Sequence, residues 1–230
     1  MKQIGIITIN HGRPNVLSLW CAQIRRLREE LEMYVPAVVV SDECDKNLCA
    51  HYGVWHITRP NIKSEVSFKW NVGLEYMRQM GMDAVMILGS DDVISTGFFK
   101  KIQEQVDKGI DLVGTNTAYF YCGQGRDRGK LVKLEGRALL GIGKTVSKRI
   151  LDKAEWRLWR VPKNWGMDAM AQKEIVQHSP SKAVIEDIIV DVKTRENLNS
   201  FNVFKNRKQV EPKVFYDILS EEELQIVKSL

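Results

Sequence analysis

The chain has 230 residues, a formal net charge of +5 and 44% hydrophobic residues. This length suits one large α/β domain, and the hydrophobic fraction is that of a globular protein with a core. No apolar run is long enough to span a bilayer, the first residues lack the pattern of a signal peptide, and the four cysteines follow no disulfide framework. We therefore expect a cytoplasmic protein, whose mild positive charge suits an anionic substrate and permits contact with nucleic acid.

The first half of the chain alternates β-branched runs with segments of helical periodicity. Pro14 suits the first turn of a helix, and Gly81 and Gly109 suit helix ends. Strands followed by helices predict a mostly parallel mixed sheet flanked by helices, which is a Rossmann-like α/β fold. The expected strands are 4–9, 37–40, 56–58, 84–88 and 112–114. The expected helices begin near Pro14, span 68–80 and begin near Thr96.

The second half is less regular. A Ser220-x-x-Glu223 capping box predicts a terminal helix. We expect one domain over 1–200, with halves 1–115 and 116–200, followed by a C-terminal extension over 201–230. The pattern also predicts strands at 118–122, 130–134 and 183–192 and a helix over 145–159.

Two adjacent carboxylates, Asp91 and Asp92, follow the strand predicted over 84–88. In open α/β sheets, ligands bind beyond the carboxyl ends of the strands. Two carboxylates there repel each other unless a cation or hydrogen-bond donors share them, and a hard divalent ion would take one or both as oxygen ligands. The alternative is a solvated turn in which Asp91 or Asp92 caps the helix near Thr96.

Three other segments accompany this pair in chain order. Thr8-Ile9-Asn10-His11-Gly12-Arg13-Pro14 follows the first strand, Asp42 ends the second, and Lys69-Trp70-Asn71-Val72-Gly73 lies about one helix before the acidic pair. In these four segments the chain resembles the family-2-type glycosyltransferases of GT-A fold. The resemblance covers about residues 3–115, and the compact architecture resembles small phage or bacterial glycosyltransferases.

The resemblance implies a donor site for a nucleoside-diphosphate sugar, with a UDP-sugar as the expected donor and Mn²⁺ or Mg²⁺ as the cofactor. Asp91 matches the last acid of the family's Asp-x-Asp motif, Gly89 stands at the first, and Asp92 would compensate. His178 lies where some members have a metal-binding histidine, so the implied metal ligands are Asp91, Asp92 and His178; a surface histidine is the alternative. The implied donor-binding residues are Thr8, Asn10, Arg13, Asp42, Lys69, Asn71, Gly73, Ser90 and Asp91.

The resemblance also places the acceptor side in residues 116–200. Asp168 matches the second acid of a Glu-Asp-like motif, with Met167 in place of the glutamate. It would be the base that takes a proton from the acceptor hydroxyl in an inverting transfer; the alternative is a helix cap.

Tryptophans alternate with basic residues over 156–165. We expect Trp159 and Trp165 to stack on the acceptor, which could be a glycan, a protein or a modified DNA base. The alternative is that the tryptophans pack inside the protein.

Two other functions stay open at this point. A nucleotidyltransferase would share the sheet and a metal-bound acidic loop, but it normally has a glycine-rich loop after the first strand, where this chain has only Gly12. A non-catalytic nucleic-acid-binding protein would use the 156–165 segment and would bind without metal. Gly143-Lys144-Thr145 mimics the end of a phosphate-binding loop, but Ala138 stands where its first glycine is required.

Overall fold

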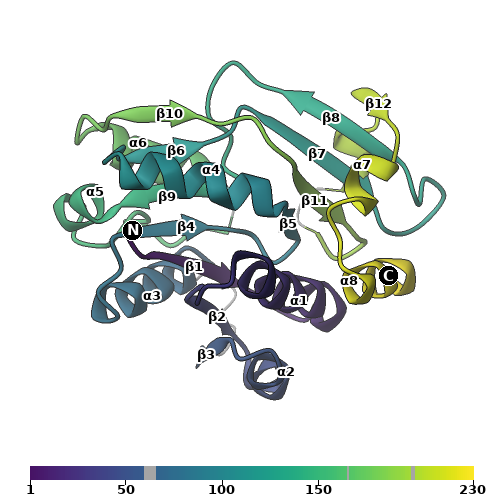
Figure 1. The fold of residues 1–230 in the computed structure, drawn as a ribbon, viewed down its shortest axis with the longest axis horizontal. Coiled ribbons are helices and arrows are strands. Elements are labelled where there is room, and N and C mark those ends of the chain that lie inside the picture. The colour runs from purple at the N-terminus through teal and green to yellow at the C-terminus, as the bar shows by residue number, and fades with distance from the viewer. Residues whose placement is uncertain (60–65, 165, 198–199) are drawn as a thin grey trace.

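The structure is a computed structural model that describes residues 1–59, 66–164, 166–197 and 200–230. Within these residues, a central seven-stranded sheet has the order β10-β6-β9-β4-β1-β2-β3 (Figure 1). All of its strands run in one direction except β9, which is antiparallel to both neighbours. This is the mostly parallel mixed sheet that the sequence predicts. The strands are β1 (Ile4–Ile9), β2 (Ala37–Ser41), β3 (Trp55–Thr58), β4 (Ala84–Ile87), β6 (Leu112–Gly114), β9 (Lys144–Ser147) and β10 (Lys182–Val184).

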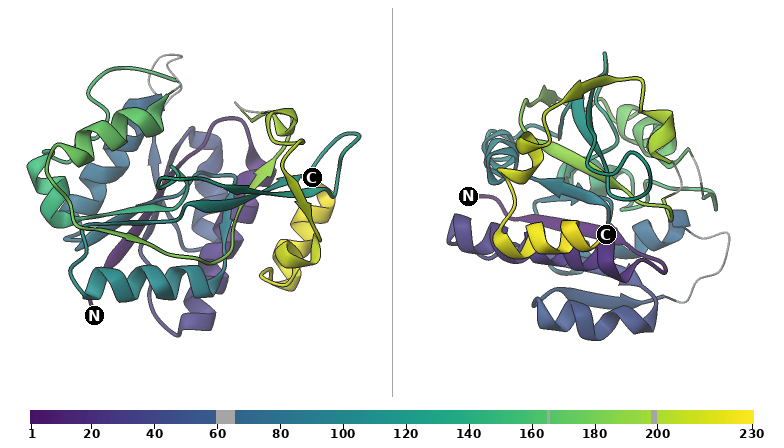
Figure 2. Two further views of the ribbon diagram at one scale, coloured as in Figure 1. Left: turned by 90° about the horizontal axis from the view of Figure 1, so that it is seen from above. Right: turned by 90° about the vertical axis from the view of Figure 1, so that its right-hand side faces the viewer.

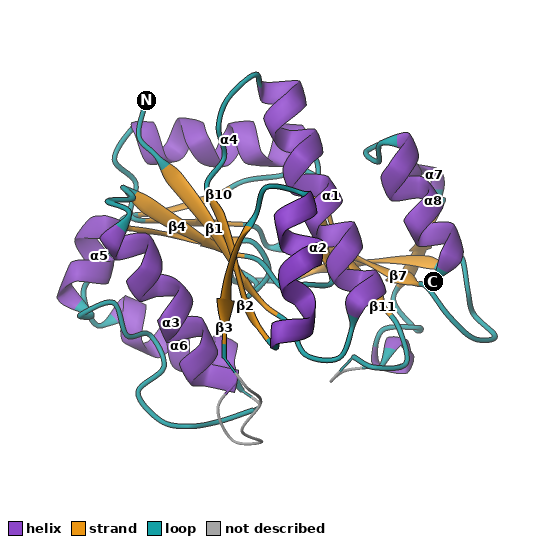
Figure 3. Cartoon of the chain, turned by 90° about the horizontal axis from the view of Figure 1, so that it is seen from below, coloured by secondary structure: helices purple, strands orange, loops and turns teal. Residues whose placement is uncertain are grey.

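Helices cover both faces of this sheet, with α1, α2 and α4 on one side and α3, α5 and α6 on the other (Figure 3). Successive side chains of a strand point to opposite faces, so Ile6 packs toward α1 while Ile7 packs toward α3. Burial on both faces explains why these strands are continuous apolar runs. The helices are α1 (Pro14–Leu31), α2 (Lys46–His51), α3 (Val66–Gln79), α4 (Thr96–Asp107), α5 (Lys148–Lys153) and α6 (Met167–Val176).

A second sheet of five strands, in the order β12-β8-β7-β11-β5, extends to one side of the central sheet (Figure 2). Its strand β5 follows β4 after four residues and pairs antiparallel with β11, so residues near 92 meet residues near 191. The strands are β5 (Asp92–Ile94), β7 (Thr117–Cys122), β8 (Leu131–Glu135), β11 (Ile189–Lys193) and β12 (Lys208–Val210).

The expectation of a single helix over 145–159 is wrong. Residues 144–147 form β9, which fills the space between β4 and β6 with backbone hydrogen bonds on both sides, and the helix that follows is only α5. The expected strand over 183–192 is two strands, β10 and β11, which belong to different sheets. In both cases pairing with distant strands overrides local periodicity.

Residues 201–230 pack closely on the rest of the chain. β12 extends the second sheet, and Phe215 of α7 (Lys213–Tyr216) and Val227 of α8 (Glu221–Ser229) are buried in that sheet's core. The capping box predicted at Ser220 and Glu223 is confirmed. In the part of the chain that the structure describes, no helix is both long and apolar enough to cross a membrane.

Candidate functional site

A pocket with a volume of about 410 Å³ opens beyond the carboxyl ends of β1 and β4. The parallel strands end together at this edge, so the loops that follow them share one cavity. Residues of the first loop, of α3, of the loop after β4 and of the end of β11 line it, among them Asn10, Arg13, Lys69, Ser90, Asp91, Met167, Lys193 and Glu196. The topology thus brings together the segments that the sequence analysis connects with a donor.

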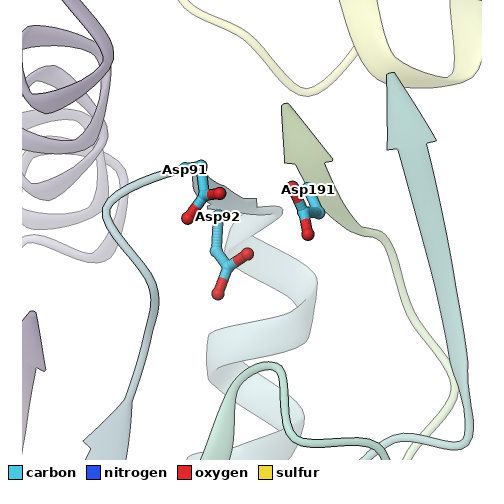
Figure 4. A group of neighbouring side chains, drawn as sticks. All are labelled: Asp91, Asp92 and Asp191. Atoms are coloured by element: carbon cyan, nitrogen blue, oxygen red, sulfur yellow. The ribbon is translucent and has the colours of Figure 1, made fainter. Parts of the chain in front are cut away.

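Three aspartates form an acidic cluster at one side of this pocket: Asp91, Asp92 and Asp191 (Figure 4). Each offers a carboxylate oxygen within 4.8 Å of the others. Asp92 lies directly opposite Asp191 in the β5–β11 pair, where like charges repel. Burial, followed by the charge of Asp91, raises the pKa of Asp191 to about 7 and raises the pKa of Asp92 well above its usual range.

Cationic side chains and the Asn197 amide, which donates from Nδ2 to Asp91 Oδ2, partly balance the cluster. The Lys193 Nζ lies 2.5 Å from Asp191 Oδ2 and 3.9 Å from Asp91 Oδ2. Burial opposes the charge of Lys193, but the two aspartates outweigh it and raise the pKa of the lysine. Arg13 approaches Asp91 Oδ2 to 3.4 Å and donates to Ser90 Oγ at 2.7 Å.

The cluster fits a hard divalent cation such as Mn²⁺ or Mg²⁺. Oxygen is the ligand type that these ions prefer. Asp191 Oδ1 is buried and has no hydrogen-bond partner among the described residues, so one carboxylate oxygen is left for a further ligand. Gly89 leaves room beside the cluster, because a Cβ there would lie 2.8 Å from Asp92 Oδ2.

The other side of the pocket contains buried polar atoms without protein partners. Lys69 is only 3% exposed, its Nζ makes no hydrogen bond within the described chain, and its nearest carboxylate oxygen, Asp42 Oδ1, is 3.8 Å away. Asn10 donates from Nδ2 to Asp45 Oδ2 at 2.9 Å, while its Oδ1 is buried without a partner. Such atoms are costly unless a ligand completes their hydrogen bonds.

The comparisons with known proteins agree on the fold. No protein-family model and no curated protein sequence matches the chain. A crystal structure of S. aureus TarS 1–349 matches with a TM-score of 0.54 and 13% identity, covering 98% of this chain and 69% of that one. The bifunctional IspDF from Campylobacter jejuni matches with a TM-score of 0.51 and 14% identity, covering 90% and 55%. A mycobacterial protein matches with a TM-score of 0.54 and 11% identity, covering 83% and 65%.

The fold is GT-A-like. Identities this low show a shared architecture and no more, so the activity has to be argued from the site itself. The chain also spans only part of these neighbours, 69% of the TarS structure and 55% of IspDF.

Five of the predicted donor residues line the pocket, namely Asn10, Arg13, Lys69, Ser90 and Asp91. Asp42 does not line the pocket but contacts two residues that do, with Oδ2 2.7 Å from His11 Nδ1 and Oδ1 3.8 Å from Lys69 Nζ, and Thr8 is buried in β1.

Asn71 and Gly73 lie outside the residues that line the pocket. Asn71 holds the backbone of Trp159, donating to its carbonyl at 2.8 Å, and Gly73 packs α3 against Ile7 of β1. The helix turns these two positions away from the cavity that Lys69 faces.

The structure does not bring His178 to the acidic cluster. His178 follows the carboxyl end of α6, 3.8 Å from Glu174, whereas Met167 at the other end of that helix lines the pocket. Ten helical residues separate the two ends by about 15 Å. The third carboxylate of the cluster that could hold a metal ion is Asp191, which the sequence analysis did not name.

Trp159 packs inside the protein, which is the alternative given in the sequence analysis. It is 3% exposed, stacks on Trp70 at 5.8 Å between ring centroids, and donates from Nε1 to the Met167 carbonyl at 3.1 Å. Burial leaves little of this ring for stacking on an acceptor, but Trp159 lines a second pocket of about 740 Å³ together with Arg157 and Arg160, so its acceptor role stays a prediction. Trp165 lies outside the described residues.

Asp168 is the second residue of α6 and is exposed, with Gly166 as the N-cap. The helix-cap alternative for Asp168 is therefore not what the structure shows. Its carboxylate lies against Gly141, where a Cβ would come within 2.1 Å of it, and its neighbour Met167 faces the pocket. Asp168 thus lies next to the cavity without lining it, whereas Glu196 is a carboxylate that does line it.

Sequence reasoning missed three residues of this site: Asp191, Lys193 and Glu196. The segment Ile189–Lys193 alternates apolar and charged residues, which indicates that Asp191 and Lys193 share one face of a strand. That signal was available, but nothing local shows that this strand pairs with residues 92–94.

Proposed function

We propose that this chain is a nucleotide-sugar transferase, specifically a glycosyltransferase that moves a sugar from a nucleoside diphosphate, with UDP as the expected nucleotide, to an acceptor hydroxyl. The observation that carries the proposal is the buried Lys69 ammonium, which has no hydrogen-bond partner in the described chain and lines a pocket with two other cations, Arg13 and Lys193. Three cationic side chains around one cavity suit a diphosphate.

In the proposed reaction, the residues of the pocket stabilise the leaving diphosphate. A bond forms between the acceptor oxygen and the anomeric carbon, and the bond from that carbon to the diphosphate oxygen breaks. The leaving diphosphate takes the electron pair, and the cations of Arg13, Lys69 and Lys193 stabilise its charge. Asp91 and Asp191 would hold the divalent ion, which when bound would neutralise further charge on the diphosphate.

A carboxylate beside the pocket must accept the proton of the acceptor hydroxyl. We assign this role to Asp168, which stands at the start of α6 beside the pocket-lining Met167. Glu196 is the matched control for Asp168, because it is an exposed carboxylate that lines the same cavity.

The test combines binding and turnover. We expect UDP to raise the melting temperature with Mn²⁺ present, because ligand binding stabilises the folded state, and Asp91→Asn to lose this shift together with turnover. Asp168→Asn should keep donor binding and lose transfer by about 100-fold or more, whereas Glu196→Gln should keep both. If Glu196→Gln alone abolishes transfer, Glu196 is the base; if no nucleoside diphosphate or nucleotide-sugar binds, the proposed function is wrong.

The products distinguish this reaction from nucleotidyl transfer. Sugar transfer releases a nucleoside diphosphate, whereas transfer of a nucleotidyl group to a sugar phosphate releases pyrophosphate. The first loop favours the former, since it contains only Gly12 where a glycine-rich phosphate loop would lie. Nucleic-acid binding that persists in chelator, without donor turnover, would support the non-catalytic alternative instead.

A further inference from the structure

Lys193 lies where the acidic cluster meets the pocket. It is the last residue of β11, is 6% exposed and lines the cavity. Its Nζ is 2.5 Å from Asp191 Oδ2 and 3.9 Å from Asp91 Oδ2. One ammonium group is therefore shared by the two carboxylates that would hold a divalent ion in the proposed function.

Two aromatic rings lie near the ammonium of this lysine. Its Nζ lies 5.7 Å from the ring centroids of both Phe120 and Phe204, which stack on each other at 3.8 Å. Ring faces attract a cation but offer no oxygen that could replace a carboxylate. A ligand that enters the pocket can offer this ammonium anionic oxygens in exchange for its carboxylate partners, because Lys193 lines the cavity.

The strand pairing concentrates negative charge beside Lys193 in the free protein. Asp191 lies opposite Asp92 across the β5–β11 pair, and Lys193 is two residues further along the same face of β11. With Arg13 at 3.4 Å from Asp91, two cations face three carboxylates. A divalent ion that enters this cluster alone meets both cations at close range, and at short distances such repulsion is worth several factors of ten in affinity.

We propose that Lys193 is a resident counter-ion that keeps the cluster's affinity for a divalent cation low until a nucleoside diphosphate enters the pocket. This inference rests on the proposed function. The diphosphate attracts the ammonium of Lys193 and thereby releases Asp91 and Asp191 for the metal. Metal and nucleotide consequently bind with positive coupling, and linkage requires each to raise the affinity for the other by the same factor.

The experiment measures the two ligands separately. Mn²⁺ binding is followed by electron paramagnetic resonance without nucleotide, and UDP binding is followed by calorimetry in chelator. Lys193→Met should bind Mn²⁺ alone about tenfold or more tightly than the native chain and should bind UDP in chelator about tenfold more weakly. Lys193→Arg should resemble the native chain in both measurements. Lys101→Met is the control, since Lys101 pairs with Asp187 at 2.9 Å and lies outside the residues that line the pocket.

Opposite changes for the two ligands identify a counter-ion, because a purely structural lysine would weaken both. Unchanged or weaker Mn²⁺ binding by a folded Lys193→Met chain overturns the inference, as does a failure of both chains to bind Mn²⁺. If Lys193→Met does not fold, Lys193→Gln replaces it in both titrations, because glutamine keeps a hydrogen-bond donor without the positive charge. If the native chain binds no nucleotide, the proposed function fails, while the Mn²⁺ titrations still decide the role of Lys193.

Discussion

At the scale of single residues, the site contains charges that the free protein satisfies poorly. Lys69 is the clearest case, because its ammonium is buried with no hydrogen-bond partner within the described chain, and the Asp42 carboxylate with which it pairs is 3.8 Å away. A buried charge without close partners lowers the stability of the fold. We therefore expect Lys69 to contribute to the affinity for a ligand and not to the free energy of unfolding, and these two quantities can be measured separately.

Replacing Lys69 by methionine should therefore affect the two properties differently. We expect the affinity for UDP to fall about tenfold or more, since a charge-assisted hydrogen bond contributes about 1.5–3 kcal/mol. The free energy of unfolding of the free protein should stay the same or rise. Calorimetry with UDP and urea unfolding measure the two quantities, with Lys46→Met as the control, because Lys46 is an exposed residue of α2. Lost stability with unchanged affinity would show that Lys69 is structural.

At the scale of elements, polar contacts at the start of β6 hold residues of the second half of the chain against the central sheet. Asp111, just before β6, accepts hydrogen bonds from Arg149 of α5 at 2.8 Å, from Ser147 at 2.9 Å and from Ser181 at 2.7 Å. One carboxylate at the start of β6 thus contacts the end of β9, the helix α5 and the residue that precedes β10. The Arg149 guanidinium, followed by the serines, holds the pKa of Asp111 well below its usual range despite partial burial.

This lowered pKa predicts how stability depends on pH. A carboxyl group whose pKa falls on folding contributes stability that is complete above its unfolded value of about 3.9 and is lost as the pH falls through the lower folded value. Asp111→Asn should cost about 2 kcal/mol near neutral pH, with a deficit that shrinks below about pH 4. Urea unfolding of both chains from pH 7 to pH 2 measures this difference in the free energy of unfolding. Asp217→Asn, in an exposed pair with Lys213, should change little, and an equal deficit at pH 7 and pH 2 would contradict the prediction.

At the scale of the whole molecule, the C-terminal residues complete the body that carries the site. Glu223 of α8 is fully buried and lies 2.7 Å from the Nε of Arg26 in α1. The same guanidinium donates to the carbonyl of Ile94 at 2.8 Å, at the end of the strand that begins with Asp92. The terminal helix is therefore coupled through α1 to the strand of the acidic cluster.

Breaking this buried pair should destabilise the entire chain in one transition. We expect Glu223→Ala to lower the free energy of unfolding by about 3–5 kcal/mol, because it removes the closest and only fully buried carboxylate that faces the buried Arg26 among the described residues. The double variant Arg26→Met with Glu223→Met should lose less than the sum of the single changes. Glu222→Gln, which affects a half-exposed pair with Arg25, is the control. Thermal unfolding that separates α8 from the rest would instead support an independent C-terminal extension.

The sequence alone determined the elements whose signals are local. The β-branched run at 4–9, the proline at 14, the helix ends at Gly81 and Gly109, and the capping box at Ser220 each depend on neighbouring residues, and each is where the structure has it. The loops after β1 and β4 were also correctly connected with one pocket, because parallel strands end at the same edge of a sheet.

Only the tertiary structure decided the parts that depend on distant pairing. β9 became a strand because β4 and β6 on either side supply its hydrogen bonds, although its local periodicity resembles the start of a helix. Asp191 and Lys193 joined Asp91 because β11 pairs with β5 across about 100 residues of sequence. Such contacts arise from the closure of a long chain around a common core, and the residues on either side of them carry no record of the partner.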